Sequence, residues 1–280
     1  MDDFPMLIFT GAALVLVVFY DFLRTTISLS GTGFLSRAIA DGLWRLGSKS
    51  TLVLERTTGL SIRGLLGPVI LLAVAGTWVL IHLCGYALIL RGGLSLVQAE
   101  TGEPATWVQT VAFAGSTLST LGASTVQVSG GWWDILSMVA AMNGMILLTL
   151  AVSFLLNILQ TTTNARTFAS RFHAVKASVP DGDMSKQLEG LGSDLTSVVV
   201  MLTASPLPRF FVPSDPTMDF PNAIVELCDL TRNGTLEKTS EIVAAIRLLG
   251  RHLGTSPDED EVAAARTWAL RHTIPRTNRR

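Results

Sequence analysis

The chain has 280 residues, 49% of them hydrophobic, and its mean hydropathy of +0.46 is too high for an ordinary soluble protein. The net charge of −1 says little, because the charged residues are unevenly placed. The sequence contains no Gly-x-Ser-x-Gly, no P-loop and no paired histidine and acid cluster, so no enzymatic activity is expected. Two cysteines without metal-ligand spacing predict neither a disulfide framework nor a metal site.

Three stretches are apolar and long enough to cross a bilayer, which takes about 20 helical residues. They run from Phe4 to Leu23, from Leu65 to Leu90 and from Trp132 to Leu159. The N-terminus lacks the basic region of a cleaved signal peptide, so residues 1–24 are predicted to remain as the first transmembrane helix.

Residues 25–64 are predicted to form a cytoplasmic amphipathic connector. Apolar residues recur there at helical spacing, with charged residues on the opposite face. Two interpretations stay open. The helix lies in the membrane interface with Trp44 as an anchor, or it packs on the C-terminal domain.

The distribution of Lys and Arg predicts the orientation. Between Leu23 and Leu65 the chain carries six basic residues, Arg24 included, against two acids, whereas the connector between the second and third spans carries one basic residue, Arg91. We therefore expect a multi-pass protein of the inner (plasma) membrane, with its N-terminus extracellular or periplasmic and its C-terminus cytoplasmic.

Residues 65–160 hold the most informative segment. An apolar stretch from Ala105 to Ser116 runs into a loop in which eight of the eleven residues from Gly115 to Thr125 are Ser, Thr or Gly. Irregular backbone is tolerated at membrane depth where it is buried in protein or lines a water-filled cavity. Rings of backbone carbonyls can replace the water around a permeating cation. The segment thus predicts an ion pathway. The alternative is an extracellular helix that caps the fold.

The helix before this loop is expected to begin at Glu103-Pro104. Proline is favoured in the first turn of a helix, and an acid there faces the positive end of the helix dipole.

The loop Thr117-Leu-Ser-Thr-Leu-Gly-Ala-Ser124 resembles the pore loops of the potassium-channel superfamily, which read like Thr-x-Thr-Thr-Val-Gly-Tyr-Gly. The resemblance covers roughly residues 65–160 and implies an outer helix, a re-entrant pore loop and an inner helix. Ala123 replaces the usual aromatic residue and Ser124 the second glycine. The single-glycine pattern is also similar to the pore loops of Trk/HKT transporters. The resemblance implies these ion-binding filter residues: Ser119, Thr120, Leu121, Gly122, Ala123 and Ser124.

One face of the third span is predicted to line the pore or form its gate, because polar residues in a span usually face the bundle interior or water. Gly144 stands where inner helices of the superfamily carry a hinge glycine, and Phe154 is the predicted constriction. Packing of this face against the second span is the alternative. The residues concerned are Asn143, Gly144, Leu147, Leu150, Phe154 and Asn157.

One pore loop cannot enclose an axis, so the pore interpretation implies a homotetramer. The predicted function is a potassium-channel-like cation channel that conducts K⁺, with Na⁺ as the alternative ion and no organic cofactor. The expected partners are the lipid membrane and other copies of the chain, with an unidentified cytoplasmic regulator left open and no nucleic acid. Two rival functions are a non-conducting scaffold or sensor that retains the architecture, and a Trk-like transport subunit.

Residues 161–280 are predicted to form a helical cytoplasmic domain, since 14 basic and 14 acidic residues leave no run able to span a membrane. Ser256 is the expected N-cap of the last helix, and Gly254 ends the helix before it. No Gly-x-Gly-x-x-Gly is present, so a nucleotide-binding domain of Rossmann type is not expected. Helices are predicted at 164–178, 184–203, 222–232, 235–253 and 257–273.

We expect a cysteine introduced at Ser256 to be protected from a membrane-impermeant maleimide in intact cells, because the basic connector places the C-terminal part inside. A cysteine at Glu100, in the predicted external loop, is the matched control and should be labelled. Labelling at position 256 from outside would refute this topology.

Overall fold

The computed structural model describes residues 3–27, 32–58, 63–122, 125–178, 185–205, 207–213, 215–237, 239–254 and 260–273. The structure is about 80% helical, and within the described ranges three helices are long and apolar enough to cross a membrane. The expected class, a mostly helical membrane protein, is confirmed. The chain divides into two compact units. The membrane unit comprises Met1–Ile27, Gly33–Arg37 and Leu72–Leu155, and the C-terminal unit comprises Ser28–Thr32, Ala38–Leu71 and Leu156–Arg280.

The three long helices are α1 (Asp3–Thr26), α3 (Leu66–Gly92) and α5 (Trp132–Ser178). With 47 residues, α5 is about 70 Å long, roughly twice the thickness of the hydrocarbon core. The predicted helix at 164–178 is confirmed as helical, but it is the last part of α5 and has no start of its own. Its apolar residues Ala165, Phe168 and Phe172 belong to the core of the C-terminal unit.

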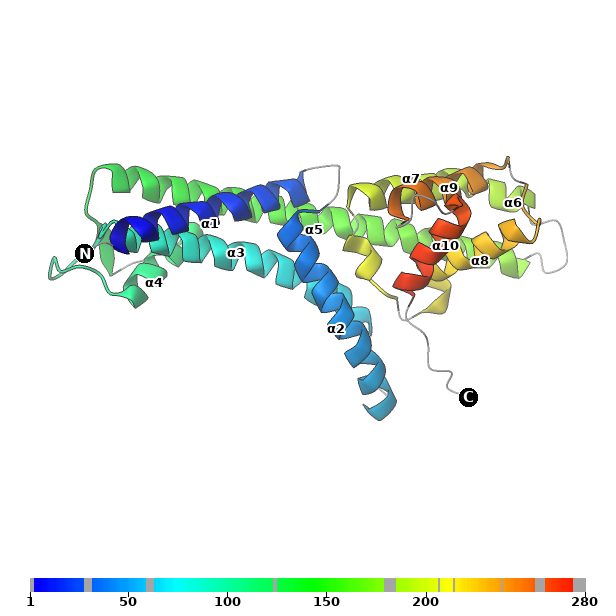
Figure 1. The fold of residues 1–280 in the computed structure, drawn as a ribbon, viewed down its shortest axis with the longest axis horizontal. Helices are drawn as coiled ribbons and strands as arrows, with labels where there is room; N and C mark the ends of the chain where they lie inside the picture. The colour runs from blue at the N-terminus through cyan, green and yellow to red at the C-terminus, as the bar shows by residue number, and fades with distance from the viewer. Residues whose placement is uncertain are drawn as a thin grey trace. The chain divides into compact units, whose positions relative to one another are not determined.

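Helices α1 and α3 of the membrane unit run antiparallel (Figure 1) and approach each other closely through small residues. A Cβ atom at Gly11 would lie 2.5 Å from the Gly85 carbonyl oxygen, and one at Gly85 would lie 2.6 Å from a Val15 methyl group. Toward the other end of the pair, the rings of Phe22 and Trp78 are 5.0 Å apart. Small residues of this kind let transmembrane backbones pack tightly without a hydrophobic driving force.

Within the membrane unit, α3 is also antiparallel to α5. The ring of Trp78 lies 5.7 Å from the ring of Phe154, and the Nδ2 of Asn143 donates to the Tyr86 hydroxyl at 3.1 Å. Helix α3 thus contacts both of the other long helices of this unit.

A buried carboxylate joins α1 to the start of α2 (Phe34–Thr58). Asp21 is fully buried, and its two oxygens accept hydrogen bonds from the backbone N–H groups of Leu35 (2.8 Å) and Ser36 (3.2 Å). The Ser36 hydroxyl (2.5 Å) and the Trp78 indole (3.2 Å) also donate to it. A carboxylate is favourable at a helix N-terminus, where free N–H groups and the helix dipole attract negative charge. Asp21 therefore caps α2 and ties it to α3.

Farther along, α2 contacts the rest of the C-terminal unit. Asp41 forms an ion pair with Arg209 at 2.9 Å, and the ring of Trp44 lies 5.3 Å from the ring of Phe210. These contacts match the interpretation in which the connector packs on the C-terminal domain. Apolar residues on the predicted interfacial face, among them Phe34 and Leu46, are exposed.

The C-terminal unit is a helical bundle around the second half of α5. Its short helices are η1 (Arg63–Leu65), α6 (Ser185–Glu189), α7 (Gly192–Ala204), η2 (Leu207–Phe210), η3 (Pro216–Met218), α8 (Phe220–Arg232), α9 (Glu241–Leu253) and α10 (Glu261–His272). The predicted helix end at Gly254 is confirmed, because Gly254 caps α9. Ser256, the predicted N-cap, lies outside the described residues. As described, α10 begins at Glu261.

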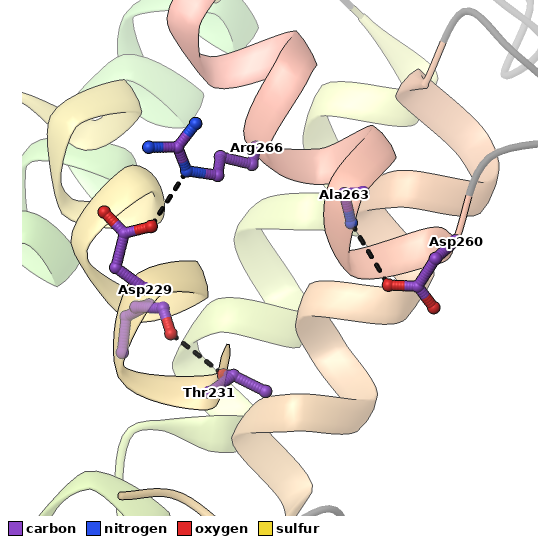
Figure 2. A network of polar contacts seen from close by, with 6 residues as sticks. Asp229, Thr231, Asp260, Ala263 and Arg266 are labelled. Carbon is purple, nitrogen blue, oxygen red and sulfur yellow. Dashed lines mark hydrogen bonds and ion pairs between the residues drawn. The ribbon is translucent and has the colours of Figure 1, made fainter. Parts of the chain in front are cut away.

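Two polar contacts hold α10 in place (Figure 2). Asp260 is its N-cap and accepts from the backbone N–H of Ala263. Arg266 pairs with Asp229 of α8 at 2.9 Å. Both contacts lie at the surface, and the apolar faces of α7 to α10 form the core of the unit.

A small antiparallel sheet in the membrane unit was not predicted. Strand β1 (Leu96–Gln98) pairs with β2 (Val126–Val128), with Leu96 opposite Val128. In the sequence, the short helix α4 (Trp107–Leu118) comes between the two strands. Strands of three residues leave too little alternation of polar and apolar residues to be recognised in a sequence.

We expect Asp21→Ala to lower the free energy of unfolding by about 3 kcal/mol, because it removes a helix cap and leaves buried donors without a partner. Asp21→Asn should cost less, since an amide oxygen can still accept from Leu35. The measurement is chemical or thermal unfolding of the purified protein in detergent. Asp134→Ala, at an exposed acid of α5, is the control. Equal stability of the two alanine variants would contradict the capping role.

Candidate functional site

Helix α4 begins differently from the prediction. Its N-cap is Thr106, whose hydroxyl accepts from the backbone N–H of Gln109, while the Gln109 side chain accepts from the Thr106 N–H at 2.8 Å. This reciprocal pair is a capping box. Glu103 and Pro104 precede the helix and lie beside β1, and the first turn of α4 contains no acid. The predicted start at Glu103-Pro104 was therefore wrong, because the Thr-x-x-Gln pattern supplies the better cap.

The C-terminal end of α4 lies directly against α5. A Cβ atom at Gly144 would overlap the carbonyl oxygen of Leu118 and would lie 2.8 Å from the Leu118 Cα. No residue larger than glycine fits at position 144 unless the end of α4 moves. Gly144 thus acts as a point of close approach between two helices.

The predicted filter residues Ser119, Thr120, Leu121 and Gly122 follow at once and lie at the surface of the single chain, with Leu121 72% exposed. The backbone N–H groups of Thr120 and Leu121 donate to the carbonyls of Thr117 (3.0 Å) and Ser116 (2.9 Å). The predicted filter residues Ala123 and Ser124 lie outside the described residues.

The backbone of this turn is strained at a residue other than glycine. Thr120 has φ +57° and Gly122 has φ +73°. A left-handed conformation costs a β-branched residue such as Thr about 1–2 kcal/mol, whereas Gly adopts it freely. Strain of this kind persists only where the surrounding structure enforces it, and it concentrates at functional sites.

Both ends of the loop are fixed by contacts within the membrane unit. One end is held by the packing of Leu118 on Gly144. At the other end, the carbonyl of Thr125 accepts from the N–H of Ala99 at 3.2 Å, next to the pairing of β2 with β1. The exposed turn is therefore presented by a rigid frame.

The predicted pore-lining face of α5 mostly contacts the chain's own helices. Asn143 bonds to Tyr86, Gly144 meets Leu118, and Phe154 packs on Trp78. Leu147 is buried, Leu150 is half-buried and Asn157 is exposed. In the single chain this arrangement agrees with the alternative that the face packs against the second span.

A polar stripe on the adjoining, exposed side of α5 was not predicted. Thr149 and Ser153 are exposed, and their hydroxyls donate to backbone carbonyls one turn earlier, at 2.9 and 3.1 Å. Asn157 follows at the same spacing of four residues. The signal was present as Thr-x-x-x-Ser-x-x-x-Asn, but the burial of one side of the helix was not visible in the sequence.

Among the described residues, the histidines do not form a second candidate site. In the membrane unit, the Nδ1 of His82 donates to the Trp78 carbonyl at 2.8 Å. In the C-terminal unit, burial lowers the pKa of His272 to about 4, so this residue is neutral near pH 7. Among the described residues, no three His, Cys, Asp or Glu side chains converge as metal ligands.

Comparisons with known proteins support the membrane assignment and go no further. No protein-family model matches the chain, and no solved structure matches it. The chain is similar to YdjJ of Bacillus subtilis (strain 168), an uncharacterized membrane protein, with 27% identity over 164 residues. The match covers 58% of this chain and 47% of the relative, so the chain spans about half the length of that protein.

We expect Gly144→Ala to displace the end of α4 and to destabilise the protein, because its methyl group would overlap the Leu118 carbonyl. Gly76→Ala in α3 is the matched control, since a Cβ atom there meets no atom within 4 Å. Alanine is favoured over glycine inside a helix by about 1 kcal/mol, so the control should be neutral or stabilising. Melting of the purified protein in detergent would measure both. A Gly144→Ala protein as stable as the control would disprove the close approach.

Proposed function

We propose that the chain is one subunit of a homotetrameric potassium-channel-like cation channel that conducts K⁺ through a shortened filter. The observation that carries this proposal is the exposed turn Ser119–Gly122 at the end of a short helix, in which Thr120 and Gly122 take a left-handed backbone conformation. The chain would lie in the inner membrane, with the turn reached from the outside.

The depth of this turn supports a re-entrant loop. Gly144 is twelve residues into α5, so it lies about 18 Å along the helix from Trp132. The hydrocarbon core is about 30 Å thick, and Trp132 is a suitable residue for its edge. Since Leu118 touches Gly144, α4 would end near the middle of the bilayer. The negative end of its dipole would then favour a cation there.

Exposure at this depth supports assembly around an axis. A polar turn facing lipid would leave backbone groups without hydrogen bonds, which is costly in hydrocarbon. Four copies would turn the same loops toward one another and supply a ring of Thr120 hydroxyl and carbonyl oxygens. The exposed apolar residues of α4, such as Val108 and Val111, would then be available to lipid or to a neighbouring copy.

The burial of α5 changes which residues would line the inner cavity. Because Phe154 and Leu147 pack within the chain, the exposed hydroxyl side with Thr149 and Ser153 is the better lining. Asn157 belongs both to the pore-lining face predicted from the sequence and to the exposed side with Thr149 and Ser153. Polar side chains on a transmembrane helix usually face water or the bundle interior, which supports this assignment.

The rival functions differ in what they require of the loop. A non-conducting scaffold or sensor needs the architecture but no ion on the axis, and the unusual Ala123 and Ser124 are its best support. A Trk-like subunit would conduct ions together with regulatory partners. Measurement of flux by the purified protein alone distinguishes the channel from both.

We expect Gly122→Ala to reduce K⁺ flux into liposomes by roughly tenfold or more, because alanine resists the φ of +73° that orients the neighbouring carbonyls. Thr120→Ala should lower K⁺ flux and alter the K⁺/Na⁺ ratio, and Thr120→Ser, which keeps the hydroxyl, should restore both. Tetramer content is measured in parallel by native mass spectrometry.

Gly102→Ala is the matched control for the backbone change. Gly102 has φ +72°, and a Cβ atom added at either glycine would meet no atom within 4 Å, so the two substitutions carry the same local strain. Only Gly122 lies in the loop. Unchanged flux and selectivity in both Gly122→Ala and Thr120→Ala would show that the loop is not a filter and would favour the scaffold.

A further inference from the structure

The membrane unit contains a groove between α1 and α5 that the proposed ion pathway does not use. Its volume is about 310 Å³. Val15, Leu16 and Phe19 of α1 form one wall, and residues of α5 form the other, with Tyr86 of α3 also in the lining. Almost all of this surface is apolar. Small-molecule sites are typically apolar cavities of about 300–1,000 Å³ with a few polar groups that fix orientation.

One polar side chain in this lining is incompletely bonded. Asn143 is 9% exposed, and its Nδ2 donates to the Tyr86 hydroxyl at 3.1 Å. Within the described part of the chain, its Oδ1 has no hydrogen-bond partner. A buried acceptor left without a donor costs about 1–3 kcal/mol. The groove therefore holds an acceptor that a bound molecule could satisfy.

The neighbouring hydroxyl supplies the complementary donor. In its bond with Asn143, the Tyr86 oxygen accepts, so the Tyr86 proton is left to donate. A hydroxyl group on a ligand can donate to Asn143 Oδ1 and accept from Tyr86 at the same time. A purely apolar molecule can do neither.

We propose that this groove binds an apolar chain that ends in a single hydroxyl, an amphiphile of the alkanol type supplied by the membrane. The apolar chain lies against Val15, Leu16 and Ile146, and the hydroxyl bonds to Asn143 and Tyr86. Water is scarce at this depth, so a lipid-borne group is the available donor. The site needs only the helices of the membrane unit and does not depend on ion conduction.

The test is photolabelling of the purified full-length protein in liposomes with a diazirine-bearing octanol, followed by peptide mapping. We expect labels on α1 near Leu16 and on α5 near Val139, competed by 1-octanol but not by octane. Asn143→Leu, which keeps the side-chain volume, should reduce this labelling several-fold, and Tyr86→Phe should reduce it less.

A matched pair of variants separates the groove from the rest of the lipid-facing surface. Val139→Trp fills the groove and should abolish the labelling, whereas Leu148→Trp makes the same change at an exposed α5 position outside it. Three results would overturn the proposal. The first is competition by octane as strong as that by 1-octanol, and the second is unchanged labelling of Asn143→Leu. The third is absence of labelling in the wild-type protein together with disulfide cross-linking of two copies of a Val139→Cys variant, which would show that a second copy of the chain covers the groove.

Discussion

The contact of the Leu118 carbonyl with Gly144 sets the position of α4 and of the turn that follows it in the membrane unit. A helix as short as α4 cannot span a bilayer, so its position depends on where its end is held. Glycine at position 144 lets that end pack backbone to backbone against α5, and the following turn takes up the left-handed conformations of Thr120 and Gly122. After the turn, the chain enters β2, which pairs with β1 and so fixes the other end of the loop. The contact and the strand pairing together define where the exposed turn lies.

Two buried polar side chains show how the membrane unit uses polarity in an apolar setting. Asp21 accepts four hydrogen bonds of between 2.5 and 3.2 Å and joins three helices, so its burial is compensated. Asn143 makes one bond and keeps a free acceptor beside a groove. The first is a structural junction. The second is the kind of incomplete bonding that a ligand can complete.

Patterns that depend on one segment were predictable from the sequence. The three long helices and the helix end at Gly254 follow from apolar runs and end signals, and the structure agrees with them. Three other features were not predicted. The capping box of Thr106 competes with a second start signal at Glu103-Pro104, and no strong local signal marks that α5 continues through Ser178. The pairing of β1 with β2 depends on contact between segments that are far apart in the sequence.

At the candidate site, too, some features were predictable from the sequence and others were not. The composition of residues 115–125 located the turn, because serine, threonine and glycine stand out beside apolar spans. The sequence did not show which side of α5 is buried, since more than one side carries polar residues at helical spacing. Only the contacts of Asn143 with Tyr86 and of Phe154 with Trp78 show which side is buried in the chain.

The most direct measurement of the central claim is a density map of the protein in lipid nanodiscs, recorded in K⁺ and again in Tl⁺, which is a heavier substitute for K⁺. We expect a fourfold axis with density beside Thr120 that becomes stronger in Tl⁺. A map in which the turns of neighbouring copies do not face a common axis, or in which the axis beside Thr120 holds no ion in either salt, would contradict the channel.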